Sequence, residues 1–436
     1  MKKLLSVLAM TTFSVGTLSS TVSCMPQKSK ESKKNPLKIG LDIDKSKVTN
    51  SSVDPKTHHG FTNYYVIGDS LSDVDGLTTY VKDKFFVSTG LDSKVDFNLN
   101  LDGSYGFKDN DGKHHNAFSN GPTTAYNIAN QLGFGPLQPS NKYSKVKENE
   151  TFGRNYSIGG ATAAKIAPQA GGILLNDVSI EEQARTLVAQ QKISSNDLVF
   201  FEIGGNDLFS MITSQQSGND AAVIKYMNDS IVRLRNALFT LLNNGIQNIF
   251  FLGPPIMDNI PRYAKEDDKE KQRIIDLGKE FEIKMQSVVK EVQSYYGDKL
   301  VFSSLYEGEN SFPIMQKEYG ELIKNEGIIE NDDQYHSNES FTKDIKIKIN
   351  NSDISKTINE FKNYFIEDNI KNYLNFDGKK ELNVLVELEG KEGWSEYEQR
   401  DEAMKKYFFT DIVHPTKHAH EYVSDKLLKE ILKEFK

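Results

Sequence analysis

The chain has 436 residues, a formal net charge of −8 at pH 7, 37% hydrophobic residues and 26% charged residues. These values are typical of a globular protein with a sizeable core. The acidic balance argues against nucleic acid as the main partner, because binding to phosphates needs a clustered basic surface. Only the N-terminal segment contains a long apolar run, so we expect no membrane span after it.

The first residues have the pattern of an export signal. Lys2 and Lys3 precede an apolar and small-residue stretch, residues 4–18, that is too short to span a membrane. Small residues that suit cleavage follow at positions 19–23. We therefore expect residues 1–23 to be removed as a signal peptide and the protein to be exported.

Cys24, the only cysteine of the chain, directly follows this segment, so no internal disulfide can form. Its place resembles the acylated cysteine of bacterial lipoproteins, where a lipid holds the N-terminus on the membrane. The usual motif has leucine three residues before the cysteine, whereas this chain has Thr21. Secretion without an anchor is therefore the alternative. The polar composition of the residues that follow predicts a flexible tether, so with the lipid on Cys24 we expect residues 24–60 to be a lipidated, flexible tether.

A short β-favouring apolar run at residues 64–67 predicts a buried strand, which begins a domain that we place at residues 61–436. Gly68, Asp69 and Ser70 end the strand where a parallel sheet presents functional groups, so Ser70 lies where a nucleophile would lie. A serine hydroxyl is a weak nucleophile at neutral pH. It needs a general base, a group that orients the base, and donors for an oxyanion.

The next segments alternate between strand and turn signals. The apolar alternation at residues 95–101, followed by a turn at 102–104, predicts a surface hairpin. An FSNG segment at residues 118–121 leads into an amphipathic helix that Gly133 ends. In the segment NYSIGGAT, residues 155–162, the paired glycines either let the backbone approach a ligand closely or form a tight turn.

A mostly apolar run at residues 197–203 predicts a central parallel strand that ends in GGND, residues 204–207. The Asn206 side chain can either enter the crevice at the strand end or cap the next helix. Helical spacing at 224–241, an apolar run at 249–252, a long charged helix at 263–296 and a short strand at 299–303 follow. This alternation predicts a doubly wound α/β sheet.

Residues 306–407 depart from this pattern and predict a small α/β insertion. Apolar residues alternate at 345–349 and at 382–388, and residues 354–374 have helical spacing. The insertion directly precedes the last motif, so it is either a lid that faces the substrate or a structural elaboration. His58, His59, His114 and His115 lie in polar segments, and we assign them no role.

The last motif, DIVHP at residues 411–415, contains Asp411 and His414. Together with His418, His420 and Glu421 these residues are potential metal ligands. The HExxH spacing is absent, however, so we expect no metal and interpret His418 and His420 as solvated helix residues.

Four motifs, GDSL at 68–71, NYSIGGAT, GGND and DIVHP, resemble in sequence order the blocks of the SGNH or GDSL hydrolases. This is a family of esterases and lipases with a flavodoxin-like, three-layer α/β/α sandwich. The FSNG segment is similar to one in the lipase and lecithinase-like branch. The resemblance covers the predicted domain except for the insertion, and it implies the same fold for this chain.

The resemblance implies acyl transfer to water without a cofactor. Ser70 would be the nucleophile, His414 the general base and Asp411 the group that orients the base. The amides of Ser70 and Gly160, with Gly159 as the one-residue alternative to Gly160, and the Asn206 side chain would form the oxyanion hole.

The expected substrates are lipid esters at a membrane surface that the protein reaches through its lipid anchor, with phospholipids or lysophospholipids first. Glycan esters or small esters are the alternative. A hypothesis from another class is a non-catalytic, surface-binding lipoprotein on a decayed hydrolase scaffold. The presence of all five motif residues argues against it, since an inactive scaffold has no chemical reason to keep them.

Overall fold

The computed structural model describes residues 43–80, 96–140, 151–166, 175–349, 352–353, 379–391, 393–394 and 401–435. The predicted signal peptide, Cys24, most of the predicted tether and the predicted helix at 354–374 lie outside the described residues. Within the described ranges, no helix is both long enough and apolar enough to cross a membrane.

Four parallel strands form the central sheet, in the order β1 (Asn63–Ile67), β5 (Asp197–Glu202), β6 (Asn248–Leu252) and β7 (Leu300–Ser303). The segment around Asn155 extends the sheet on the free side of β1. The Val66 amide donates to the Arg154 carbonyl at 2.9 Å, and the Tyr156 amide donates to the Val66 carbonyl at 2.8 Å. The predicted α/β fold with a parallel sheet is confirmed, and it is consistent with the SGNH hydrolase fold.

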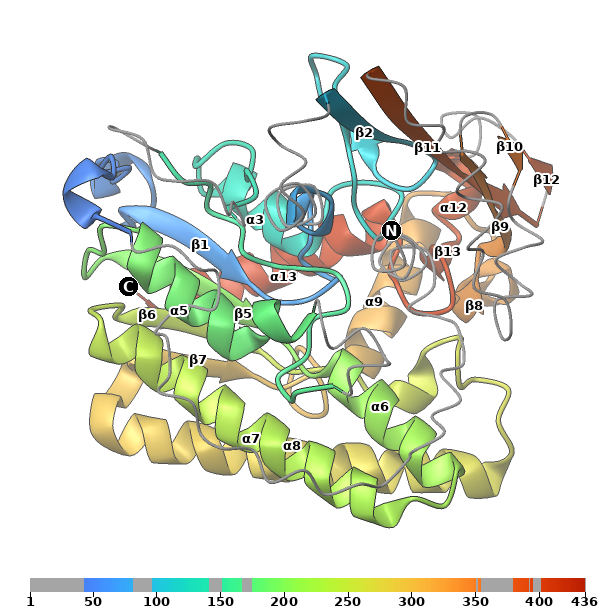
Figure 1. Ribbon diagram of the computed structural model, residues 1–436. Helices are drawn as coiled ribbons and strands as arrows, with labels where there is room; N and C mark the ends of the chain where they lie inside the picture. Colours follow the sequence, from blue (N-terminus) through green and yellow to red (C-terminus); the bar gives the residue numbers. More distant parts are fainter. Residues whose placement is uncertain are drawn as a thin grey trace.

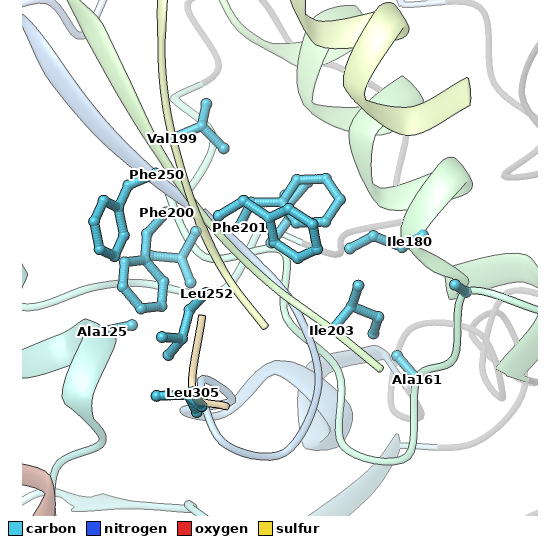
Figure 2. Packing of buried hydrophobic residues seen from close by; sticks show 14 of the residues in the cluster. Ala125, Ala161, Ile180, Val199, Phe200, Phe201, Ile203, Phe250, Leu252 and Leu305 are labelled. Carbon is cyan, nitrogen blue, oxygen red and sulfur yellow. The ribbon is translucent and has the colours of Figure 1, made fainter. Parts of the chain in front are cut away.

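The central strands are apolar because both of their faces are buried. Phe200 on β5 lies opposite Phe250 on β6, and the next pair in register is Phe201 with Phe251. Successive side chains of a strand point to opposite faces. Figure 2 shows Phe200 and Phe250 on the side of Ala125, and Phe201 on the side of Ile180. The core therefore lies on both faces of the sheet.

Helices cover both of these faces (Figure 1). Because β1, β5, β6 and β7 advance in one direction across the sheet, right-handed connections place α5, α7 and α8 together on one face. Helices α3 and α13 pack against each other on the other face. The described helices are α3 (Thr124–Gln131), α5 (Ile180–Gln190), α6 (Gly205–Gln216), α7 (Asp220–Asn243), α8 (Asp268–Tyr296), α9 (Phe312–Asn325), α12 (Asp401–Met404) and α13 (Lys417–Glu434). Short 3₁₀ helices are η1 (Lys45–Lys47), η2 (Pro55–Thr57), η5 (Asn176–Val178), η6 (Met257–Asn259), η7 (Gly297–Lys299) and η8 (Asp332–Gln334).

A second sheet lies apart from the central one (Figure 1), and we call it the accessory sheet. Its strands are β2 (Asp96–Gly103), β9 (Thr342–Ile349), β10 (Ser352–Asp353), β11 (Lys379–Gly390) and β12 (Gly393–Trp394). Strand β2 pairs in parallel with β11, far away in the sequence. The predicted surface hairpin at residues 95–104 is therefore wrong, because the partner of β2 comes from the predicted insertion.

Two small strand pairs complete the fold: β3 (Phe107–Lys108) with β4 (His114–His115), and β8 (His336–Ser340) with β13 (Tyr407–Phe409). Helix α9, which lies inside the range predicted as an insertion, packs into the main core. Its Met315 and Tyr319 are buried, and the Phe312 ring lies 5.6 Å from the Phe408 ring, centroid to centroid. The chain thus departs from the central domain after α9, not at residue 306.

Residues 43–60, the described part of the predicted tether, pack against the domain. Val48 is buried, and the Val53 amide donates to the Thr62 carbonyl at 2.9 Å. His58, which we assigned no role, lies with its Nε2 atom 3.1 Å from the Gly133 carbonyl oxygen. Residues 43–60 are therefore part of the folded domain, which corrects the prediction that the tether extends to residue 60.

Candidate active site

The loop after β1 holds Ser70 at the carboxyl end of the central sheet. Gln183 of α5 brackets Gly68, since its Oε1 accepts from the Gly68 amide and its Nε2 donates to the Gly68 carbonyl, each at 2.8 Å. A Cβ atom at Gly68 would lie 2.7 Å from the Glu202 carbonyl oxygen, so only glycine lets the loop approach β5 this closely. The Ser70 side chain that follows is 5% exposed.

The structure brings Ser70, His414 and Asp411 together from opposite ends of the chain. Ser70 Oγ lies 2.8 Å from His414 Nε2, and His414 Nδ1 lies 2.7 Å from Asp411 Oδ2. The imidazole is 1% exposed. A hydroxyl, an imidazole and a carboxylate in this order and at these distances can activate the hydroxyl as a nucleophile.

Asp411 reaches the imidazole because its own loop folds back on itself. Asp411 Oδ1 accepts the amides of Val413 and His414, both at 2.7 Å. The Thr410 amide donates to the His414 carbonyl at 2.8 Å and closes the loop. Helix α13 begins directly afterwards, with Thr416 as its N-cap. A spacing of three residues therefore suffices to place the carboxylate on one imidazole nitrogen.

The FSNG segment supports this loop from the other side. Asn120 Oδ1 accepts from the Thr410 hydroxyl at 3.0 Å and from the Lys417 amide at 2.6 Å. The Ser119 hydroxyl donates to the Pro415 carbonyl at 2.8 Å. Sequence reasoning used FSNG only as a resemblance, whereas the structure shows that its polar side chains fix the loop that carries His414.

Asn206 lies in the first turn of α6, beside Ser70 in the lining of the same pocket. The N-cap of α6 is Gly204, with φ of 121°, so the Asn206 side chain is not the cap. Its Nδ2 donates to the Ala161 carbonyl at 3.0 Å and to Asp69 Oδ2 at 3.2 Å. These two bonds fix the amide at the end of the central strand and use both of its hydrogens, so Asn206 donates to an oxyanion only by giving up one of these acceptors.

The paired glycines differ in what their backbone does. The Gly159 amide donates to Asp73 Oδ2 at 2.6 Å, so it is not free to receive a ligand. Gly160 follows with φ of 79°, a conformation that favours glycine. Of the two residues that the sequence offered as oxyanion donors, this geometry favours Gly160.

Two buried aspartates, Asp73 and Asp207, brace the loops around Ser70. Asp73 also accepts the amides of Gly76 at 2.6 Å and Leu77 at 3.0 Å. Burial raises the pKa of Asp73 to about 7, and the amide donors oppose this shift. Asp207 accepts the amides of Ala163 at 2.9 Å and Ala164 at 2.8 Å, which ties the segment after Gly160 to α6.

Sequence reasoning missed an acidic pair beneath the nucleophile. Glu202, the last residue of β5, accepts from the Asp69 amide and from the Ser72 hydroxyl, each at 3.3 Å. Burial raises the pKa of Glu202 well above its usual value, and the nearby Asp69 raises it further. Burial also raises the pKa of Asp69. Asp69 Oδ1 accepts the Leu71 amide at 3.1 Å, so Asp69 braces the nucleophile loop.

The interpretation of His420 as a solvated residue is wrong. His420 is 3% exposed, and its Nδ1 accepts from the Thr124 amide at 3.1 Å. Burial lowers its pKa to about 3, so the imidazole is neutral at pH 7. His418 Nε2 lies 2.8 Å from Asp401 Oδ1 and is partly buried. The described residues contain no group of three or more side chains placed to hold a metal ion.

His115, which we placed in a polar turn, is also buried. Its Nδ1 lies 2.7 Å from Asp75 Oδ2 and its Nε2 lies 3.1 Å from Asp109 Oδ2. The hydrogen bond to Asp75 raises the pKa of His115, while burial opposes the shift and the bond to Asp109 adds to it. This charged cluster holds β4 against the segment that follows the nucleophile loop.

A pocket opens beside Ser70 and Asn206. It has about 830 Å³ of empty space including its mouth, within the range of about 300–1,000 Å³ that is common for small-molecule sites. Most of its lining is apolar: Leu71, Phe200, Phe209, Leu252, Pro255, Met257, Ile260, Leu305, Phe312, Met315, Phe408, Phe409, Val413, Pro415 and Val423. The arrangement places an activated hydroxyl at the edge of a space for an apolar group.

The fold and the site together define an α/β ester hydrolase with a serine at the end of its first strand. The sequence model of the family described as GDSL-like Lipase/Acylhydrolase matches residues 64–427. The chain therefore belongs to this family and is a carboxylic ester hydrolase. No curated protein matches the chain.

Proposed function

We propose that the protein hydrolyses lipid esters through an acyl-enzyme formed on Ser70. The observation that carries the proposal is the place of Ser70, which is bonded to His414 at 2.8 Å and lies in the lining of a largely apolar pocket. Each methylene of an acyl chain that leaves water for such a pocket contributes about 0.8 kcal/mol. A long acyl chain should therefore bind better than an acetyl group.

In the proposed reaction, His414 Nε2 removes the proton from the Ser70 hydroxyl as its oxygen attacks the ester carbonyl. Asp411 holds the Nδ1 side of the ring and stabilises the imidazolium that forms. The amides of Ser70 and Gly160 and the Asn206 side chain receive the oxyanion. His414 then protonates the leaving alcohol, and a water molecule activated by the same imidazole releases the acid.

We place phospholipids or lysophospholipids first among the substrates, because a largely apolar pocket suits their acyl chains. The same triad serves glycan esters and small esters, so these remain the alternative activities. A surface-binding lipoprotein without catalysis is the second class of function. The short Ser70–His414 and His414–Asp411 distances argue against it, since a scaffold that only binds has no use for an aligned triad.

We further propose that the enzyme acts at the outer face of the cell membrane through a lipid on Cys24. The signal-like residues 1–23 and the single cysteine that follows support this location. Expression in a bacterial host with an alkyne analogue of palmitate tests it. The wild type should carry the label and sediment with membranes, and Cys24→Ser should lose both properties. An unlabelled, released wild type would point to simple secretion.

The activity is tested with p-nitrophenyl esters of increasing chain length and with phosphatidylcholine and its lyso form. Wild type, Ser70→Ala and an EDTA-treated sample are compared. We expect activity that rises with acyl length, survives EDTA and is absent from Ser70→Ala. A preference for acetate would favour the small-ester or glycan alternative. No activity from folded wild type on any of these esters would favour the binding function.

The pocket itself is tested by filling it. Leu305 lines the pocket, and Leu305→Trp should lower hydrolysis of long-chain esters far more than that of acetate. Leu322 on α9 is 37% exposed, so Leu322→Trp is the matched control and should change neither. An equal loss on both chain lengths in Leu305→Trp would contradict an acyl-binding role for the pocket.

A further inference from the structure

The carboxylate of Asp411 has a partner that comes from outside the central domain. The Tyr105 hydroxyl donates to Asp411 Oδ2, the same oxygen that accepts from His414 Nδ1. Asp411 Oδ1 is occupied by the two amides of its own loop. Tyr105 therefore completes the set of donors around the carboxylate, and it is the only side chain besides His414 for which the described residues show such a bond.

The accessory sheet holds Tyr105 in this place. The Ser104 amide donates to the Val386 carbonyl of β11 at 2.7 Å, and the Leu388 amide donates to the Ser104 hydroxyl at 3.2 Å. On the other side of Tyr105, the Gly106 amide donates to the Ser119 carbonyl at 2.7 Å. Tyr105 is thus fixed between β11 and the FSNG segment, which itself supports the His414 loop.

Two glycines allow the backbone to make this link. Gly103 has φ of 131° and Gly106 has φ of 101°, and both values favour glycine. A Cβ atom at Gly103 would overlap the Val386 carbonyl oxygen. The sequence Gly-Ser-Tyr-Gly therefore passes close along β11 and then turns towards the site. Only a chain without a side chain at position 103 can carry Tyr105 this way.

The chemistry of the contact follows from the charges around the imidazole. Among the described residues, Asp411 bonds to His414, and Asp69 and the neutral His420 interact with its charge. A hydroxyl that donates to Asp411 Oδ2 restrains the carboxylate and draws electron density from the oxygen that faces the ring. Tyr105 does not line the pocket, so it has no direct contact with an acyl chain there.

We propose that Tyr105 is a positioning residue for Asp411 and His414, and that the accessory sheet sets the catalytic rate by holding Tyr105 in place. This inference rests on the proposed roles of Ser70, His414 and Asp411. It gives the accessory sheet a function other than that of a lid, because its described strands act on the carboxylate and contribute no residue to the pocket lining.

Tyr105→Phe removes the hydroxyl and keeps the ring. We expect kcat to fall about tenfold with KM unchanged, because the less restrained carboxylate holds the imidazole less often in line with Ser70. This loss of alignment outweighs the stronger attraction between the carboxylate and the imidazolium. The acidic limb of the kcat/KM profile should move to higher pH, because a carboxylate with one donor fewer stabilises the imidazolium more strongly. A role in folding alone would not move this limb.

Tyr422→Phe is the matched control. Its hydroxyl also donates to a carboxylate, Glu318 Oε2 at 2.6 Å, but it lies outside the pocket lining and has no contact with Asp411. We expect kcat and the pH profile of this variant to equal those of the wild type. Loss in both variants would show that any broken tyrosine–carboxylate bond lowers activity, and would overturn the proposal.

The role of the accessory sheet is tested with Gly103→Ala, which forces β2 away from β11. This variant should reproduce the lower kcat and the shifted limb, and the double variant Gly103→Ala/Tyr105→Phe should be no slower than either single one. Additive losses would overturn the link between the sheet and Tyr105. If Gly103→Ala does not fold, Ser104→Ala, which removes only the acceptor of the Leu388 amide, replaces it in the same cycle with the same expectation.

Failure of this inference differs from failure of the proposed function. If Ser70→Ala retains activity, the serine mechanism itself is wrong. If Ser70→Ala is inactive and Tyr105→Phe keeps the kcat and the pH profile of the wild type, the mechanism stands and the role of Tyr105 is wrong.

Discussion

The two sheets of this protein are built on different principles. The central sheet is buried on both faces, its strands follow one another along the chain, and it carries Ser70 and Asn206 at its carboxyl edge. In the accessory sheet, Val384, Val386 and Leu388 of β11 are buried, whereas Lys348 and Glu387 form an ion pair at 2.8 Å on its accessible part. Strands of this sheet come from segments far apart in the sequence.

In the proposed mechanism the catalytic side chains are held in place by two layers. The central sheet is packed on both faces, and the accessory sheet is less deeply packed. Groups that must not move during the reaction are fixed to elements packed on all sides. Asp411, the acidic member of the proposed triad, lies on a loop between α13 and the small β8–β13 pair, and one of its donors is Tyr105, which follows β2 of the accessory sheet. In our proposal the second sheet therefore affects the chemistry through Tyr105, while Val384 and Val386 of β11 also belong to the main hydrophobic core.

The largest expected effect is on the free energy of unfolding, which a truncation in the central sheet should lower more than one in the accessory sheet. Phe250 is fully buried against Phe200, with ring centroids 6.0 Å apart. Phe250→Ala should lower the free energy of unfolding by about 3–5 kcal/mol. Leu388→Ala in the accessory sheet should cost about 2 kcal/mol, at the low end for leucine, because its sheet is buried on one face only. Urea unfolding followed by circular dichroism measures both.

Ile224→Ala is the control for these two variants. Ile224 is 61% exposed on α7, so its truncation should change the free energy of unfolding by less than about 0.5 kcal/mol. Equal costs for Phe250→Ala and Leu388→Ala would contradict the view that the accessory sheet is the less deeply packed layer.

The next effect concerns a donor fixed to the central sheet. Asn206→Ala should lower kcat by roughly 100- to 1,000-fold with the fold intact, since this is the usual cost of one oxyanion donor. Steady-state hydrolysis of a p-nitrophenyl ester measures it, with the exposed Asn196→Ala as control. A fully active Asn206→Ala would remove this side chain from the mechanism. A loss no larger than that of Tyr105→Phe would contradict the greater importance of the central sheet.

A smaller effect follows from His420, which joins α13 to α3 on the central sheet. Its pKa in the folded state is about 3, below the unfolded value. Its contribution to stability is therefore complete above about pH 6.5 and is lost as the pH falls towards 3. Between pH 7 and pH 5 the wild type should lose about 2 kcal/mol more than His420→Asn, whose side-chain oxygen can still accept the Thr124 amide. Urea unfolding of both proteins at both pH values measures this difference. Equal losses of unfolding free energy in the wild type and in His420→Asn would contradict a buried, neutral His420.

The smallest effect has the opposite sign and concerns His115. Its pKa is raised by Asp75 and Asp109, so its contribution to stability is complete below the unfolded pKa and is lost as the pH rises through the folded value. Relative to His115→Asn, the wild type should therefore become less stable from pH 6 to pH 8. Thermal unfolding at the two pH values measures the difference. If the wild type gains stability over this range relative to the variant, the protonated His115 is not stabilised by Asp75 and Asp109.

Much of the central domain could be predicted from the sequence because its signals are local. The strands with two buried faces are continuous apolar runs, and the helices between them have regular apolar spacing. The motif residues could be assigned because four short segments occur in the order of a known family. None of them would have sufficed alone, because a helix cap explains Asn206 equally well and a tight turn is the better explanation of the paired glycines taken by themselves.

The accessory sheet and its link to the site could not be predicted in this way. Neither β2 nor β11 contains a sequence pattern that indicates its partner in the parallel pair. Tyr105, with a glycine on either side in the segment Gly-Ser-Tyr-Gly, is typical of a turn. Other misses had a signal. His420 shares a helical face with Leu427 and Ile431, which indicates burial, and Glu202 is an acidic residue inside an otherwise apolar strand, which indicates a special partner.

The central claim is that Ser70 is the nucleophile, and covalent labelling tests it most directly. The protein is incubated with a fluorophosphonate, digested and examined by mass spectrometry, with residual ester hydrolysis measured in parallel. We predict one adduct per chain, located on Ser70, and loss of activity in proportion to labelling. An adduct on another residue with Ser70 unmodified, or full activity after complete labelling of Ser70, would contradict the proposed mechanism.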